Sequence, residues 1–554
     1  METAITAALC RQPGSVHWKN EEEQRGELER EEEKQECNSN KREKKNNKKN
    51  GQKKKKDVYV SVIILQKDEG FKVQQIEEPH HLQCHPTWDE ALEELKSIAK
   101  ISGPTALSTL LLYLRSMVSM LFLGHLGDLQ LAAGSLSLGF ANITAHSILT
   151  GLSMGMEPIC GQAFGAKRWS LIALTLLKTI LILLCASLPI GLIWLSMERF
   201  MLWCGQDHEV TSLASTFIIF SLPDLLAQAI LHPLKIYLRV QNETLALATC
   251  AAISLSLHIP INFFLVFGLG LGLKGVALSS IWTNFNLVFL LLLYVCKNGA
   301  HGPTFHGLRP MDCFTNWKPL LQLAIPSCAS VCLEWWWYEL MILLCGLLSE
   351  PQPKVAAMGV LIQTTSLLYI LPSSLSLGIS TRVSHELGAD NPTSARRATI
   401  VGLMGSALLG LFSMGFATSV LHVWGLMFTR ERSILRLISQ ALPIIGLCEL
   451  FNCPQTSGCG LLRGCARPGL GAYINLGSFY LLGLPVAVSL AFFLGLGFVG
   501  LWLGLLTAEA CCLLLMLLAL VNTDWTAQAA RANSLTGSET EPLILEGEDR
   551  VNFA

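Results

Sequence analysis

Charged residues are scarce in this chain. Asp, Glu, Lys and Arg make up 15% of its 554 residues, whereas a soluble globular domain averages about 25%. Hydrophobic residues account for 51%, and the mean hydropathy is +0.43. This shortage of charge excludes an ordinary soluble domain and indicates an all-α polytopic membrane protein.

The sequence also lacks common catalytic and metal-binding motifs. It contains neither the HExxH pair of zinc proteases nor a phosphate-binding GxxxxGK[ST] loop. Its 18 cysteines are scattered, many in apolar runs, which favours small buried hydrophobes over a disulfide framework. The group His80, His81, Cys84 and His85 has no second cluster to complete a metal site. We therefore expect no enzymatic activity, no cofactor and no metal.

Residues 1–95 differ in composition from the rest of the chain. A Glu-rich block at 21–36 is followed by a Lys-rich block at 41–56. Blocks of like charge cannot bury a core, so we expect a disordered cytosolic tail. Residues 526–554 are interpreted as a second cytosolic tail.

Between the tails, apolar segments of about 20 residues follow one another, and each is long enough to cross hydrocarbon as a helix. We predict twelve membrane helices, at 103–124, 131–153, 170–195, 211–231, 247–267, 274–295, 319–348, 355–378, 398–420, 434–456, 470–492 and 497–521.

Two similar stretches organise this series. Residues 153–167 read SMGMEPICGQAFGAK and residues 376–390 read SLGISTRVSHELGAD, so glycines recur 223 positions apart. Other landmarks recur at nearly the same offset: Gly270-Leu-Gly272 returns as Gly495-Leu-Gly497. The constant offset indicates an internal duplication, and each copy is interpreted as a hinge between two membrane helices.

The duplication divides the membrane region into 96–315, with helices 1–6, and 316–525, with helices 7–12. Because each repeat holds an even number of helices, the two should be parallel, related by an axis along the membrane normal. Lys and Arg are more numerous in the loops on the N-terminal side, apart from a cluster at 430–436. This bias predicts that both termini are cytosolic.

Glu334 is the first candidate for a functional residue. Ionisable groups at membrane depth cost several kcal/mol and are usually retained for function. Glu334 lies near the middle of the seventh predicted helix, in CLEWWWYEL, beside Trp335. Tyr338, one turn further on, shares its face and is placed to donate a hydrogen bond to the carboxylate. We interpret Glu334 as a proton-coupling residue; the alternative is a permanently paired carboxylate.

Glu449 is the second candidate. It lies in the tenth predicted helix, in LCELFNCPQTSGCG, with Asn452 at i+3 and a kinking Pro454 beyond. A kink with a carboxyl and an amide on one face suits a cavity wall. The alternative is a helix end that reaches the membrane interface.

Several further polar residues in apolar segments are predicted to line a cavity. Each is equally well explained as an interhelical hydrogen bond, the commoner role of buried amides. They are Gln363, Ser366, Asn284 and Asp224. Glu509 in the last helix is a weaker candidate, and no partner is evident for Arg115 in the first.

Four segments together resemble one family. They are CGQAFGAKRW, LEWWWYELM, IQTTSLLYILPSSLSLGISTRVSHELGADNP and RGCARPGLGAYINLGSFYLLGLP. They are similar to the plant branch of the MATE family, the multidrug and toxic compound extrusion antiporters, called DETOXIFICATION proteins in plants. The resemblance covers about residues 95–525.

The resemblance implies two six-helix lobes around a central cavity and proton-coupled export of organic solutes. It places Glu334 at the family's acidic proton site in the seventh helix. In the tenth helix it places Asn452 where family members commonly have an acid, with Glu449 one turn earlier as a substitute. The first-helix acid of prokaryotic members has no counterpart, because Arg115 is the charged residue of that helix.

The sequence thus predicts a proton-coupled antiporter that exports or sequesters organic solutes by alternating access. The expected solutes are xenobiotics, secondary metabolites or organic cations. We expect a monomer in the plasma, vacuolar or an endosomal membrane, with protons and a small solute as partners and no nucleic acid. The alternatives are a flippase for lipids or lipid-linked molecules and a non-transporting membrane scaffold.

Overall fold

The computed structural model describes residues 87–297, 305, 310–421 and 423–537. The described residues fall in one compact unit, and its regular elements are all helical. Most of the predicted tail 1–95 and much of the tail 526–554 lie outside the described residues. The first helix nevertheless begins at Trp88, where a capping box between Thr87 and Glu90 satisfies free backbone N–H groups.

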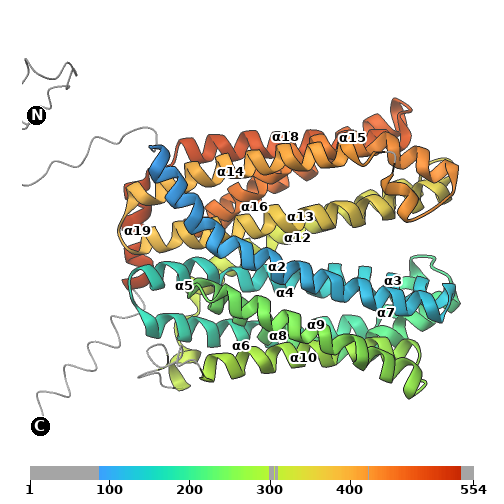
Figure 1. Ribbon diagram of the computed structural model, residues 1–554, viewed down its shortest axis with the longest axis horizontal. Helices are drawn as coiled ribbons and strands as arrows, with labels where there is room; N and C mark the ends of the chain where they lie inside the picture. The colour runs from blue at the N-terminus through green and yellow to red at the C-terminus, as the bar shows by residue number, and fades with distance from the viewer. Residues whose placement is uncertain (1–86, 298–304, 306–309, 422, 538–554) are drawn as a thin grey trace, which may run out of the picture. The chain divides into compact units, whose positions relative to one another are not determined.

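Helices of the first repeat form one half of the unit (Figure 1). They are α2 (Trp88–Leu126), α3 (Asp128–Ala141), η2 (Asn142–His146), α4 (Ser147–Met154), α5 (Met156–Gly165), α6 (Trp169–Leu195), α7 (Met197–Trp203), α8 (His208–Val240), α9 (Thr244–Phe263), η3 (Phe264–Gly268) and α10 (Leu273–Lys297).

Helices of the second repeat form the other half, after the short η4 (Pro310–Phe314). They are α12 (Lys318–Gly346), α13 (Pro351–Gly388), α14 (Pro392–Ser419), η5 (Trp424–Met427), α15 (Arg432–Gly464), α16 (Pro468–Asn475), η6 (Leu476–Gly483), α17 (Leu484–Val488), η7 (Ser489–Phe493) and α18 (Gly497–Val521). The terminal α19 (Trp525–Gly537) packs on α5, α13 and α14.

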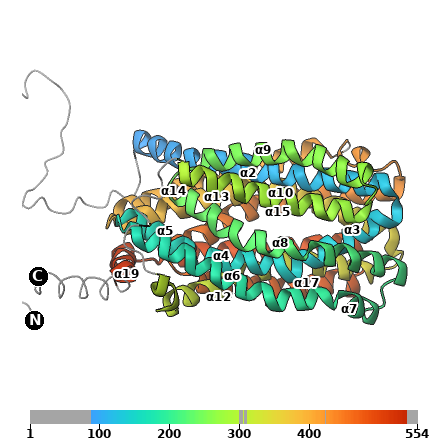
Figure 2. The same cartoon turned by 90° about the horizontal axis from the view of Figure 1, so that it is seen from below.

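Eleven helices within the described residues are long and apolar enough to cross a membrane. The remaining predicted span, 131–153, is divided among α3, η2 and α4, because a π turn at 142–146 interrupts the α-helical hydrogen bonds. The prediction of an all-α membrane protein is confirmed, and the long helices run side by side in two views (Figures 1 and 2).

Most of each duplicated stretch is helical, which corrects the interpretation of the whole stretch as a hinge. Residues 156–165 form α5, and residues 376–388 complete α13. The chain turns at the last residue of each stretch, Lys167 and Asp390, whose φ angles are 58° and 59°. Glycine serves close helix packing here: a Cβ on Gly165 would lie 2.0 Å from the carbonyl oxygen of His385.

The glycine contacts also reveal the symmetry of the repeat. Gly388, the equivalent of Gly165, would place a Cβ 2.0 Å from the carbonyl oxygen of Gln162. Each duplicated helix thus packs on the other through the same pair of positions. The π segments η3 and η7 also recur at the repeat offset. The internal duplication predicted from the sequence is therefore visible in the packing.

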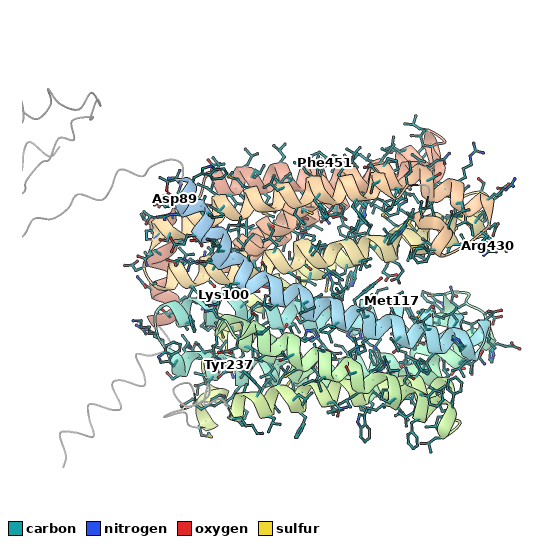
Figure 3. All side chains as sticks on the ribbon, viewed as in Figure 1. Asp89, Lys100, Met117, Tyr237, Arg430 and Phe451 are labelled. Carbon is teal, nitrogen blue, oxygen red and sulfur yellow. The ribbon has the colours of Figure 1, made fainter. Side chains whose placement is uncertain are left out.

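Besides the packing of α5 on α13, further contacts join the halves. α2 packs against α9 of its own half and against α13 of the other, while α12 packs against α4. Figure 3 shows Asp89 and Lys100 toward one end of the unit and Arg430 at the opposite end. The start of α2, the turns after α5 and α13, and α19 share the first end (Figure 1).

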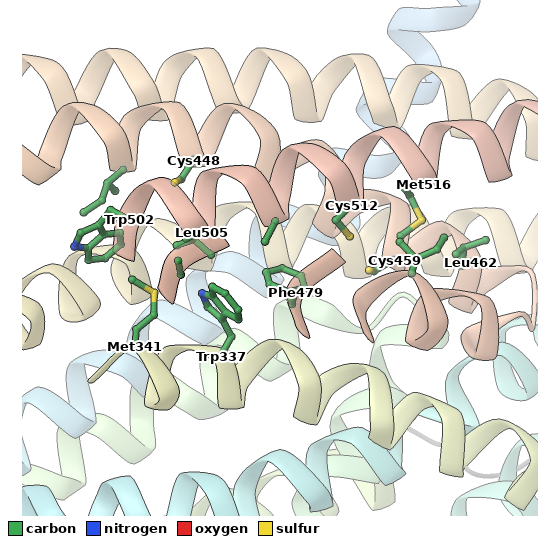
Figure 4. Close-up of a cluster of buried hydrophobic side chains, with 14 of the residues drawn as sticks. Trp337, Met341, Cys448, Cys459, Leu462, Phe479, Trp502, Leu505, Cys512 and Met516 are labelled. Carbon is green, nitrogen blue, oxygen red and sulfur yellow. The ribbon is translucent and has the colours of Figure 1, made fainter. Parts of the chain in front are cut away.

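The largest apolar cluster fills the second half. Trp337 of α12 is 1% exposed, and its ring centroid lies 5.6 Å from that of Phe479. Cys448, Trp502, Leu505 and Met516 belong to the same cluster (Figure 4). This packing fixes α12 against the interior of its half. The side chains on the opposite face of α12 therefore point toward the other half.

Candidate functional site

Glu334 lies on α12 where the two halves meet. Its Oε1 accepts a hydrogen bond of 2.9 Å from the hydroxyl of Tyr369 on α13. Helical spacing predicted Tyr338 as the donor, and Tyr338 does line a pocket together with Glu334. The hydrogen bond to Glu334, however, comes from Tyr369. Spacing along one helix cannot identify this donor, because it belongs to a neighbouring helix.

Two adjoining pockets share Glu334. The aromatic pocket, of about 330 Å³, is lined by Trp335, Trp336, Tyr338 and Glu339 of α12, by α13, and by Asn142 and Ile143 of the first half. The long pocket, of about 360 Å³, is lined by α12, α13 and α15 together with Tyr113 and Thr150 of the first half. Trp335, Ser366 and Tyr369 line both pockets, as Glu334 does. Both pockets therefore lie between the halves.

Hydrogen bonds cross between the halves beside the pockets. The indole N–H of Trp336 donates to the carbonyl oxygen of Ile143, at 3.3 Å, in the π turn η2. The hydroxyl of Tyr113 donates to the side-chain oxygen of Gln363, at 3.2 Å. Gln363, predicted to line a cavity, thus serves an interhelical hydrogen bond, and the sequence had left both roles open.

Glu449 and Asn452 lie behind this wall rather than on it. Glu449 is 2% exposed, and its Oε2 accepts from the side-chain amide of Asn452 at 3.2 Å. Both side chains lie on one helix face, as their i+3 spacing predicts, but among the described residues neither lines the two pockets. Glu509 of α18, the weaker candidate from the sequence, is also buried, at 2% exposed, and does not line either pocket among the described residues.

Asp224 and Asn284, predicted to line a cavity, lie at a different pocket from that of Glu334. They line a pocket of about 80 Å³ inside the first half. The side-chain amide of Asn284 donates to Asp224 at 2.5 Å, and its oxygen accepts from Arg115 at 2.5 Å. Asn284 is therefore the partner that sequence reasoning could not assign to Arg115, and it bridges the two charges.

A charged group closes the end of the long pocket. Arg463 of α15 lines that pocket, and its Nε lies 3.6 Å from Oε2 of Glu157 on α5. Oε1 of Glu157 lies 3.4 Å from Arg239 of α8. Sequence reasoning missed this group, although Glu157 is an acid inside one copy of the duplicated stretch. Arg239 and Arg463 lie in the last turns of α8 and α15, where a basic residue is commonly explained by the helix end alone.

Comparison with known proteins places these features in a family. The MatE family model matches residues 104–264 and 326–489, one segment in each repeat. Protein DETOXIFICATION 48 of Arabidopsis thaliana is 57% identical over 466 residues, which are 84% of this chain and 87% of the relative. Protein DETOXIFICATION 49 of the same plant is 58% identical over 446 residues, 80% of this chain and 89% of the relative.

Solved structures agree with the fold. The crystal structure of a eukaryotic MATE transporter, AtDTX14, is 30% identical, with a TM-score of 0.78 over 80% of this chain and 99% of that one. The Vibrio cholerae MATE transporter VcmN in the bent form shares 16% identity, with a TM-score of 0.67 over 80% of this chain and 99% of that one. The second likeness supports the arrangement of helices alone.

Proposed function

The chain belongs to the MatE family, and from that premise we propose that this membrane transporter exchanges protons for an organic solute. The observation that supports proton coupling is the position of Glu334. It is an ionisable side chain at membrane depth, it faces both pockets between the halves, and a tyrosine of the next helix holds it.

Protonation of Glu334 changes the hydrogen bond between its side chain and α13. The carboxylate accepts the hydrogen bond of Tyr369, whereas the protonated carboxyl has no charge and is itself a donor. A proton therefore alters the contact between α12 and α13, two helices that pack against the other half. A difference in contact energy between two conformations is what biases the equilibrium between an outward-facing and an inward-facing state.

The coupling has the sign that exchange requires. A cationic solute and a proton compete for one carboxylate, so binding of either disfavours binding of the other. Trp335, Tyr338 and Tyr369 beside Glu334 supply ring faces that attract a cation. Glu449, buried behind the wall with Asn452, is proposed as a second proton site that carries no solute contact.

We propose the following organisation around this site. Residues 96–315 and 316–525 move as two lobes, and both tails lie on the cytosolic side with the start of α2. The solute leaves the cytosol by way of the long pocket, either across the plasma membrane or into a vacuolar or endosomal compartment.

The test is gradient-driven exchange in sealed proteoliposomes with the aromatic cation ethidium as solute. Glu334→Gln keeps the size and hydrogen bonding of the side chain but removes the titration, so exchange driven by a pH gradient should fall to near background. Ethidium binding should weaken, because the neutral amide resembles the protonated acid, and it should lose its dependence on pH. Glu339→Gln is the matched control, because Glu339 lines the aromatic pocket only, and it should retain most of the exchange.

Two results would contradict the proposal. Full exchange by Glu334→Gln under the same pH gradient would place the proton site elsewhere. Exchange that collapses when choline replaces Na⁺, with the pH gradient intact, would make Na⁺ the coupling ion.

A further inference from the structure

The long pocket has charges of opposite sign on its wall. Glu334 and Arg463 both line it, and each is held by a side chain of α13. Tyr369 donates to Glu334 at 2.9 Å, and the guanidinium of Arg463 donates to Ser376 Oγ at 3.3 Å. Tyr369 and Ser376 are two turns apart, so the charged groups are separated along α13 by about 10 Å at 1.5 Å per residue.

Arg463 is poorly satisfied by the protein. Its Nε is buried and has no hydrogen-bond partner among the described residues. Its ion contact with Glu157 is long, at 3.6 Å. Both carboxylate oxygens of Glu157 also have no hydrogen-bond partner among the described residues, although an arginine and a carboxylate in good geometry form two short bonds.

The charge in this group is also unbalanced. Arg239 and Arg463 are two cations, and among the described residues Glu157, with 0% of its side chain exposed, is the one acid in contact with both. Burying an unpaired charge costs free energy, because the charge loses its contacts with water. An opposite charge or hydrogen bonds of good geometry can offset this cost. The end of the pocket at Arg463 therefore favours a ligand group that is negative and can accept two hydrogen bonds.

We propose that the long pocket binds a bipolar organic solute, with a cationic nitrogen at Glu334 and a carboxylate at Arg463, about 10 Å apart. The planar guanidinium matches a carboxylate with two parallel N–H bonds, which a lysine cannot reproduce. Between the ends, Val331, Trp335, Ile370 and Leu377 offer an apolar and aromatic surface for the middle of the solute. The part assigned to Glu334 rests on the proposed function, whereas the part assigned to Arg463 does not.

This assignment links solute binding to the contact between the halves. Glu157 lies on α5 of the first half and Arg463 on α15 of the second. A solute carboxylate competes with Glu157 for the same guanidinium, and so weakens an ion contact that joins the halves. Glu157 keeps Arg239 of its own half as a partner, so it is not left as an isolated buried charge.

The test uses probes that differ only in charge or length. ω-Aminooctanoate has both charges at about the required separation, its methyl ester lacks the anion, and ω-aminobutanoate has both charges but is too short. Binding to the full-length protein in lipid nanodiscs is followed by tryptophan fluorescence, since Trp335 lines the pocket. We expect ω-aminooctanoate to bind about tenfold more tightly than either control, as befits one charge-assisted pair.

Variants of Arg463 locate the effect. Arg463→Gln should bind the acid and the ester equally, with ester affinity unchanged, and Arg463→Lys should retain part of the preference. Equal binding of acid and ester by the unaltered protein would overturn the proposal, as would a full preference in Arg463→Gln. If Arg463→Gln binds neither probe, the comparison in the unaltered protein and in Arg463→Lys decides the matter. Failure of proton coupling would show separately, as loss of gradient-driven exchange with this preference intact.

Discussion

Glu334 and Glu449 differ in what surrounds them, although the sequence presents them alike. Both are acids in apolar segments with a polar neighbour one turn away, and the sequence identified both. Glu334 faces two pockets and takes its hydrogen bond from another helix, whereas Glu449 bonds Asn452 on its own helix. The i+3 spacing was sufficient to place Glu449 and Asn452 on one face, because both residues lie on one helix. The spacing of residues along one helix carries no information about a donor on a different helix.

The polar residues of the first half show the same limit. Asp224, Asn284 and Arg115 are far apart in the sequence, and nothing in their local pattern tells which side of a helix faces the other half. Their helices bring them together around a small pocket of their own. Interhelical hydrogen bonds, the commoner role of buried amides, account for Asn284 and Gln363 alike.

The position of Glu449 leads to a prediction at this scale. Glu449→Gln should reduce proton-driven ethidium exchange severalfold but leave ethidium affinity unchanged, because Glu449 does not line either pocket. Affinity and exchange are measured on the same nanodisc and proteoliposome preparations. A loss of affinity as large as the loss of exchange would show that Glu449 contacts the solute, and unchanged exchange would remove it from the proton path.

At the scale of helices, the glycines of the duplicated stretches have a different role from the one predicted. They were interpreted as hinges because glycine commonly permits turns. In the structure they permit two helix backbones to touch, and the chain turns only after the helices end. Sequence position alone does not separate these uses, because both require the absence of a Cβ.

Alanine substitutions distinguish the two uses of glycine. Gly165→Ala and Gly388→Ala should each destabilise the protein by roughly 1–3 kcal/mol or more, because the new Cβ meets a backbone carbonyl of the opposite helix. Gly415→Ala is the control: it lies in α14 with nothing within 4 Å of an added Cβ. It should stabilise by about 0.5–1 kcal/mol. Thermal unfolding in detergent ranks the three variants by melting temperature. Equal melting temperatures for all three would refute the packing role of Gly165 and Gly388.

The start of α2 sets where the N-terminal tail can be removed. Thr87 caps the helix, Glu94 bonds Arg382 at 2.7 Å, and Glu90 pairs with Arg397 at 3.1 Å. Deletion of residues 1–86 should therefore preserve a monodisperse protein and its exchange activity. Deletion of residues 1–94 removes both ion pairs with the second half and should lower the melting temperature. Aggregation of the protein without residues 1–86 would show that the tail contributes to folding, and equal melting temperatures for the two deletions would show that the ion pairs do not stabilise the fold.

At the scale of the whole molecule, the duplication was the most informative feature of the sequence. A constant offset predicted two equivalent halves, and the turns at Lys167 and Asp390 repeat with nearly identical φ angles. The contacts between the halves were beyond the sequence, because they depend on which faces of α2, α5, α12 and α13 meet. The group of Glu157, Arg239 and Arg463 was missed for that reason.

The equivalence of the halves makes a prediction about membrane sidedness. Lys167 and Asn391 are both exposed, directly beyond α5 and α13, and a parallel repeat places both on one side of the membrane. Arg430 is exposed at the opposite end of the unit (Figure 3). We expect cysteines at 167 and 391 to react with an impermeant maleimide from the cytosol, and a cysteine at 430 only from the other side. The exposed Cys185, Cys204 and Cys296, together with Cys10, Cys37 and Cys84 of the N-terminal tail, are first replaced by serine to remove background labelling. Labelling of 167 and 391 from opposite sides would require an inverted repeat, which an even number of helices per half does not allow.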